Sequence, residues 1–233
     1  MDVLCAAAAK ERYLFKAQLY KASSQVRPVI IHKHVHFEQN GTTEIDPVPV
    51  TPKEPSKLNT LLSGTVLSSE TFEIYNRLTK AHKDLLIESF KPMEEEAPRN
   101  GLAIFIKLFQ DYPNYKSLFP QFRALTDSAL FDAVQLRTHG KVYMAGLKSI
   151  IDQLEDEDAL FKELKKIAKT HLKKGIRRFH VQNNLESVLD TVRAANGGMP
   201  LPDKTREAWK TLFDVIACLI EEFKAQESNN RLH

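Results

Sequence analysis

From Ser68 to about residue 225, hydrophobic residues recur at the 3.6-residue spacing of an α-helix. Charges and glycines agree with the ends of these segments: Asp156 and Asp158 put negative charge at one helix start, and Gly175 follows the lysines of "HLKK". No segment here shows the alternation and tight turn of a β-hairpin. The pattern predicts an all-α fold, with helices at about 68–91, 99–112, 127–153, 158–174, 180–196 and 202–225.

A different pattern precedes these helices. Five of the 11 prolines fall in residues 28–55, and each lacks an N–H and restricts its predecessor to extended geometry. We therefore predict an extended or disordered N-terminal extension with a Pro-rich linker at 1–66, a helical domain at 67–226 and a C-terminal tail at 227–233.

The extension contains three alternating histidines in "HKHVH": His32, His34 and His36. Alternate side chains of an extended chain share a face, so the three imidazoles could bind Zn or Cu together. An exposed strand or a disordered polar segment is the favoured interpretation, because no rigid scaffold surrounds them.

Composition narrows the class of protein. The formal charge is +3 in 233 residues, and the basic run from Lys165 to Arg178 lacks interleaved aromatic residues, which argues against nucleic acid. Cys5 and Cys218 are too few for a disulfide framework. No apolar run reaches membrane-spanning length, and the N-terminus is a poor secretory signal. A cytoplasmic protein is expected.

Familiar catalytic motifs are absent. The sequence contains no GxGxxG, P-loop, HExxH, CxxC or GxSxG pattern. Catalysis through such a motif has no support, and the expectation is a protein that is not an enzyme.

Two histidines lie on the hydrophobic faces of consecutive predicted helices. His139 falls on or beside the face of Leu136 and Leu147, and His171 shares the face of Leu164 and Ala168. A single histidine in such a position is ordinarily a core residue hydrogen-bonded to a carbonyl. Two of them can face one space and bind an iron or a flat metal cofactor through both imidazoles.

At this point the sequence resembles the globin family, in particular invertebrate intracellular globins with an N-terminal extension. "GLAIFIKLFQDYPNYKSLFPQF" resembles the family's second helix and proline corner, with Pro113 at the start of the short third helix. Phe119 matches the phenylalanine that stacks on heme. His139 in "THGKV" matches the distal histidine, and His171 in "IAKTHLKKGI" the proximal one. "KTREAWKTLFDVI" resembles the final helix, so the likeness covers about residues 78–225.

The resemblance implies a globin fold that binds heme b, with His171 as the iron ligand. His139 would either occupy the sixth iron position, giving a hexacoordinate iron, or stabilise bound O2. The pocket would also receive Phe119 and Phe122, and four side chains for which ordinary core packing is the alternative: Phe105, Tyr143, Ile167 and Ile176. For Phe122, core and heme edge are equally expected.

One position departs from the family pattern. Four residues after the distal histidine, globins usually have a small aliphatic residue, and this chain has Tyr143. Its side chain could crowd the ligand space, donate a hydrogen bond into it, or point its hydroxyl to the rim. Phe105 stands where some globins have a hydrogen-bonding tyrosine, and it cannot donate.

The implied function is binding of O2 or another diatomic gas. A role in sensing, redox chemistry or electron transfer is expected equally with oxygen storage or transport. The basic run is by default a solvated helix face. Alternatively, Arg177 or Arg178 pairs with a heme propionate, or the run docks an acidic redox partner protein. The rival interpretations are a heme-free helical interaction module and a heme-dependent enzyme resembling a nitrite reductase or peroxidase.

Overall fold

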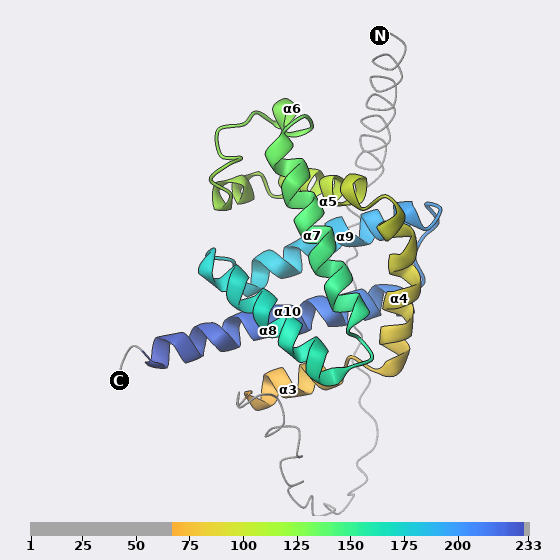
Figure 1. The fold of residues 1–233 in the computed structure, drawn as a ribbon, viewed down its shortest axis with the longest axis vertical. Helices are drawn as coiled ribbons and strands as arrows, with labels where there is room; N and C mark the ends of the chain where they lie inside the picture. The colour runs from red at the N-terminus through yellow and green to blue at the C-terminus, as the bar shows by residue number, and fades with distance from the viewer. Residues whose placement is uncertain (1–66, 231–233) are drawn as a thin grey trace, which may run out of the picture. The chain divides into compact units, whose positions relative to one another are not determined.

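The computed structural model describes residues 67–230, and these residues form helices joined by short connections (Figure 1). The all-α prediction is confirmed for this part of the chain, which contains no strand. Predictions for residues 1–66, including metal binding by His32, His34 and His36, lie outside the described residues. In chain order the elements are α3 (Ser69–Asn76), α4 (Lys80–Glu95), α5 (Ala97–Asp111), the 3-10 helix η1 (Pro113–Leu118), α6 (Asp127–Leu130), α7 (Val134–Asp152), α8 (Glu157–Lys173), α9 (Arg178–Ala195) and α10 (Asp203–Asn230).

The first predicted helix, at 68–91, is two helices in the structure. Thr79 interrupts it, because its backbone is extended and its side chain accepts a hydrogen bond from the N–H of His82, capping α4. The predicted end before Pro92 is also wrong, since α4 continues to Glu95. Met93 is fully buried, and its burial favours the extra turn despite the N–H that proline lacks.

Two later boundaries also differ from the prediction. Thr126 caps the short helix α6 by accepting from the N–H of Ala129, and residues 131–133 separate α6 from α7. The predicted 127–153 helix is therefore two helices. The last helix runs to Asn230, through most of the segment that we predicted as a tail.

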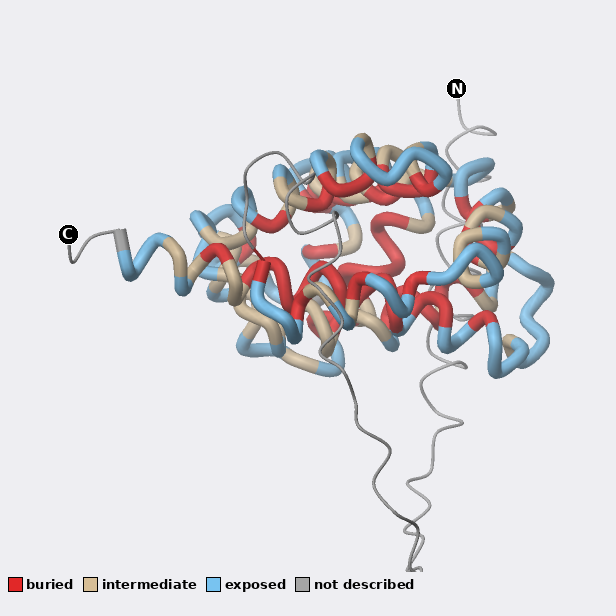
Figure 2. The backbone as a smooth tube through the Cα atoms, turned by 90° about the horizontal axis from the view of Figure 1, so that it is seen from below, coloured by how far each residue is buried: buried red, intermediate tan, exposed pale blue. Residues whose placement is uncertain are grey.

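Helix α10 carries much of the core and packs against α3, α4, α8 and α9. Figure 2 shows the buried residues on the inward sides of the helices and the exposed ones outside. Trp209 of α10 is fully buried, and its indole N–H donates to the Ser89 hydroxyl at 3.0 Å. Ser89 in turn donates to the carbonyl of Leu85 at 2.6 Å. This chain of bonds satisfies the indole and fixes α10 against α4.

Helices α5 and α7 cross at backbone contact. A Cβ atom on Gly140 would lie 2.8 Å from the carbonyl carbon of Gly101, and a Cβ on Gly101 would overlap the carbonyl of Gly140. The crossing therefore requires glycine at both positions. The crossing also places Phe105 beside His139. Phe105 lies one turn after Gly101 on α5, and His139 precedes Gly140 on α7.

Candidate functional site

His139 lies among three phenylalanine rings, one on α5 and two in the segment that follows η1. Its ring centroid is 4.6 Å from that of Phe105 on α5, and 5.2 Å from that of Phe119, which follows η1. Phe122, in the next turn, is 6.0 Å away. All three contacts are edge-on, a favourable geometry for aromatic rings. The structure thus brings together four of the sequence-predicted site residues.

These rings differ in burial. Phe122 is fully buried and Phe105 is 3% exposed, whereas His139 and Phe119 are half-buried. Phe122 also packs against Phe109 at 6.0 Å. Phe122 therefore packs in the core, and the more open His139 and Phe119 lie at its border.

Tyr143 lies one turn after His139 on the same side of α7, and its ring is 5.2 Å from that of Phe105. Its hydroxyl accepts a hydrogen bond from Asn184 Nδ2 on α9 at 2.8 Å. The hydroxyl therefore points across to α9, which removes the rim orientation considered above. Burial raises the pKa of Tyr143, which the Asn184 hydrogen bond only partly opposes, so the hydroxyl stays protonated.

Asn184 was not identified from the sequence, although a signal was present. It is 8% exposed and shares a face of α9 with Val188 and Thr191, which are also buried. An asparagine at a buried helical position needs a hydrogen-bond partner. The partner, Tyr143, is 41 residues away in the chain and could not be identified from periodicity.

His171 lies in the last turn of α8 and is half-buried. Its Nδ1 is 2.8 Å from the carbonyl oxygen of Ile167. A carbonyl can only accept, so Nδ1 carries a proton, and in the neutral form of the ring the lone pair lies on Nε2. This is the state in which an imidazole binds a metal through Nε2, with its ring orientation fixed by the carbonyl.

The end of α8 fixes the chain after His171. Gly175 has a φ of 76°, and the N–H of Ile176 bonds to the His171 carbonyl at 3.1 Å. This left-handed glycine ends the helix and turns the chain toward α9. Ile167 and Ile176, both predicted pocket residues, are half-buried and pack against the core. Three further half-buried apolar residues pack in the same way: Leu172, Val181 and Leu185.

The two histidines interact electrostatically. Burial lowers the pKa of His139, and the nearby His171 lowers it further. The lowered pKa favours the neutral form of His139 at pH 7. A neutral imidazole is a suitable ligand for heme iron.

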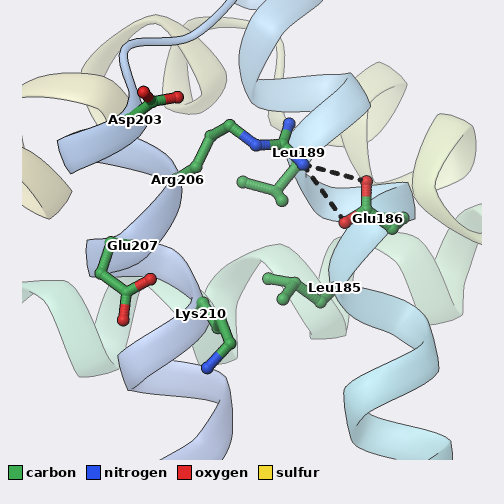
Figure 3. Close-up of a pocket in the computed structure, with 7 residues that line it drawn as sticks. All are labelled: Leu185, Glu186, Leu189, Asp203, Arg206, Glu207 and Lys210. Carbon is green, nitrogen blue, oxygen red and sulfur yellow. Dashed lines mark hydrogen bonds and ion pairs between the residues drawn. The ribbon is translucent and has the colours of Figure 1, made fainter. Parts of the chain in front are cut away.

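A separate pocket of about 250 Å³ lies between α9 and α10 (Figure 3). Its walls are charged, and Arg206 pairs with Glu186 at 3.4 Å across it. Neither His139 nor His171 lines this pocket, so we do not assign the candidate site to it. The lining residues are Leu185, Glu186, Leu189, Asp203, Arg206, Glu207 and Lys210.

Two features are absent from the residues that the structure describes. No group of three or more His, Cys, Asp or Glu side chains there is arranged to hold a metal ion. No helix among them is both long enough and apolar enough to cross a membrane.

Comparison with known proteins assigns the chain to a family. The family model described as Globin matches residues 102–220, just over half of the chain, and the chain belongs to the globin family. A globin from Nerita albicilla is 24% identical over 149 residues, which cover 64% of this chain and 94% of that protein. A globin from Busycotypus canaliculatus is 32% identical over 102 residues, 42% of this chain and 69% of that protein. A protein from Gossypium hirsutum that is named as an anaerobic nitrite reductase is 26% identical over 151 residues, 63% and 91% of the two chains. Globins typically bind heme and diatomic gases such as O2.

Proposed function

We propose that this chain binds heme b between α7 and α8, with His171 as the iron ligand. The hydrogen bond from His171 Nδ1 to the Ile167 carbonyl carries the proposal, because it leaves Nε2 free as a ligand atom. The neutral His139, the Phe105 and Phe119 rings and the half-buried isoleucines fit a large apolar disc.

Heme b would supply an iron that binds O2 or another diatomic gas. Phe105 offers no hydrogen-bond donor to such a ligand, and the Tyr143 hydroxyl is directed to Asn184 on α9. His139 is the polar group nearest the phenylalanine rings. We propose that it occupies the sixth iron position when no external ligand is bound. An external ligand would then bind only to molecules in which His139 has left the iron, and its apparent affinity would be the intrinsic affinity multiplied by the fraction of such molecules.

The proposed role is sensing, redox chemistry or electron transfer, alongside oxygen storage. The exposed lysines of α8, Lys162, Lys169 and Lys173, support docking of an acidic redox partner. Arg178 is already paired with Glu70 at 3.3 Å, so Arg177 is the better candidate for a propionate. A cytoplasmic location is part of the proposal, because two cysteines cannot form a disulfide framework.

The test is the absorption spectrum of the purified full-length protein. We expect a Soret band, and split visible bands of low-spin iron in the deoxygenated ferrous state. His171→Ala should abolish stable heme binding, or leave binding that added imidazole restores. His139→Leu should keep heme but replace the split bands by the single broad band of five-coordinate iron.

Each variant separates one claim from the others. Full heme occupancy in His171→Ala, with an unchanged ferrous spectrum, would show that another group holds the iron. A broad ferrous band in the unaltered protein would leave His139 as a hydrogen-bond donor only. No Soret band at all would favour the heme-free interaction module.

An enzyme is the second candidate. A relative whose printed name is an anaerobic nitrite reductase supports it, because the cofactor would carry the chemistry. Anaerobic consumption of nitrite by the protein with excess chemical reductant, in amounts exceeding the protein present and above a control without protein, distinguishes turnover from simple binding.

A further inference from the structure

Helix α9 buries polar side chains on the face that it turns to the interior. Asn184 is 8% exposed and Ser187 is 1% exposed. The two lie three residues apart, so their Cβ atoms are neighbours at about 5–6 Å on one helix face. Buried polar groups are hydrogen-bonded in nearly all proteins, so each of these side chains should have partners.

The partners in the protein are incomplete. Asn184 Nδ2 donates to the Tyr143 oxygen, but Asn184 Oδ1 and the Ser187 hydroxyl have no partner. Rotating the amide by 180° would let Tyr143 donate to Oδ1 and would leave Nδ2 unpaired instead. One amide atom and one hydroxyl therefore remain unsatisfied in either orientation.

Tyr143 adds a third unused group. Its oxygen accepts from Asn184, which leaves its own O–H proton available as a donor. The free groups thus include donors, from Tyr143 and Ser187, and acceptors, from Asn184 and Ser187. None of the three side chains is charged, so the set suits a neutral molecule that both donates and accepts hydrogen bonds.

We propose that Asn184, Ser187 and Tyr143 form a buried site for one such small molecule. In the resting protein this molecule is water. A buried water typically makes two to four hydrogen bonds, and this set provides that number. The adjoining residues Val188 and Leu189 are themselves buried, so the site is closed off from bulk solvent. Without a bound molecule, burying these polar groups would cost the full free energy of their desolvation.

The position of this site gives it a consequence that rests on the proposed heme function. Tyr143 lies one helical turn from His139, and Phe105 contacts both rings. The bound molecule would therefore lie behind the distal wall of the heme pocket and fix the Tyr143 side chain there.

The sign of one stability change tests the site without reference to heme. In full-length Ser187→Ala, loss of a partner of the bound molecule should lower the Tm by about 2–4 °C. If the site is dry, the same change removes an unsatisfied hydroxyl, and the Tm should stay the same or rise. Circular dichroism during thermal unfolding measures this.

Thr191→Val is the matched control. Thr191 is also buried on the same helix, and its hydroxyl already donates to the Ser187 carbonyl at 2.9 Å. It should lower the Tm whether or not the site is filled, which sets the scale of one lost bond. A crystal structure of the full-length protein should show an ordered water in contact with Asn184 and Ser187.

An unchanged or raised Tm in Ser187→Ala, or a site without ordered density in that crystal, would overturn the proposal. The heme spectrum of each variant is recorded separately. A protein that lacks a Soret band but loses stability in Ser187→Ala would reject the heme function and keep this site.

Discussion

The two histidines lie at the border of the core and not at its centre. His139 and His171 are half-buried, while Gly140, next to His139, and Ala168, three residues before His171, are buried. Helical spacing was enough to place both histidines beside a hydrophobic face. The polar contact of His171 explains its position, since one nitrogen bonds to a carbonyl and the other is left for a ligand.

A third histidine gives a prediction of pH dependence. Burial lowers the pKa of His180, and the charge of Arg177 lowers it further. The neutral ring accepts a hydrogen bond at Nδ1 from the N–H of Arg177 at 3.0 Å. Because the folded pKa is below the unfolded value of about 6.5, the unfolded chain takes up protons first. The stability that His180 contributes is complete above that pH and is lost as the pH falls below it.

Urea unfolding at pH 7 and pH 5 measures this effect. In His180→Gln, the loss of unfolding free energy between the two pH values should be smaller than in the unaltered protein. In the heme-free protein, part of the remaining dependence is expected from His139, whose pKa is lowered in the same direction. An equally steep loss in His180→Gln would show that His180 does not titrate in this range.

At the scale of helices, the sequence predicted which segments are helical better than where they end. The 3.6-residue spacing comes from burial, which extends along a whole helix, whereas an end depends on one local bond. The capping bond of Thr79 divides the first predicted helix, and the burial of Met93 carries α4 past Pro92. Neither effect alters the spacing of hydrophobic residues around it.

The crossing of α5 and α7 gives a prediction at the same scale. Gly140→Ala would place a methyl group within 2.8 Å of the Gly101 backbone, and neither helix can yield without moving the other. We expect a loss of about 1–3 kcal/mol in unfolding free energy. His139, the preceding residue in the chain, should move away from Phe105 and Phe119. If the protein binds heme, its absorption spectrum should change as well.

Gly146→Ala is the control for this prediction. It lies in the same helix, and a Cβ there would meet nothing within 4 Å. Replacing a glycine in an open helix interior should stabilise the protein by about 0.5–1 kcal/mol. Chemical unfolding of both variants gives the comparison, and equal effects would show that the close crossing does not constrain the fold.

For the whole molecule, residues far apart in the chain account for what the sequence could not predict. The family pattern placed His139, His171 and the phenylalanines in one region, and the structure brings Phe105, Phe119, Phe122 and Tyr143 together around α7. The Tyr143–Asn184 bond could not be predicted, because it depends on how α7 and α9 are turned toward each other. The pairing of α3 with α10 through Glu222, 151 residues from Thr71, has the same origin.

That pairing supports a prediction about where the globin domain begins. Leu67 is buried, and both the N–H of Ser68 and the Thr71 hydroxyl donate to Glu222, at 3.1 and 2.9 Å. Tyr75 is buried against Phe161 with ring centroids 6.1 Å apart. A protein shortened to begin at Leu67 keeps all of these contacts. We therefore expect it to keep the heme spectrum of the full chain, with a free energy of unfolding changed by less than about 1 kcal/mol.

A second shortened protein, beginning at Lys80, is the matched comparison. It lacks α3, and with it the burial of Tyr75 and Leu78. Loss of two large buried side chains should cost at least about 3 kcal/mol, measurable by urea unfolding alongside the heme absorption. The full chain and the protein that begins at Leu67 should thus be equally stable, and both should be more stable than the protein that begins at Lys80. Loss of heme or precipitation of the Leu67 form would instead place part of residues 1–66 within the functional domain.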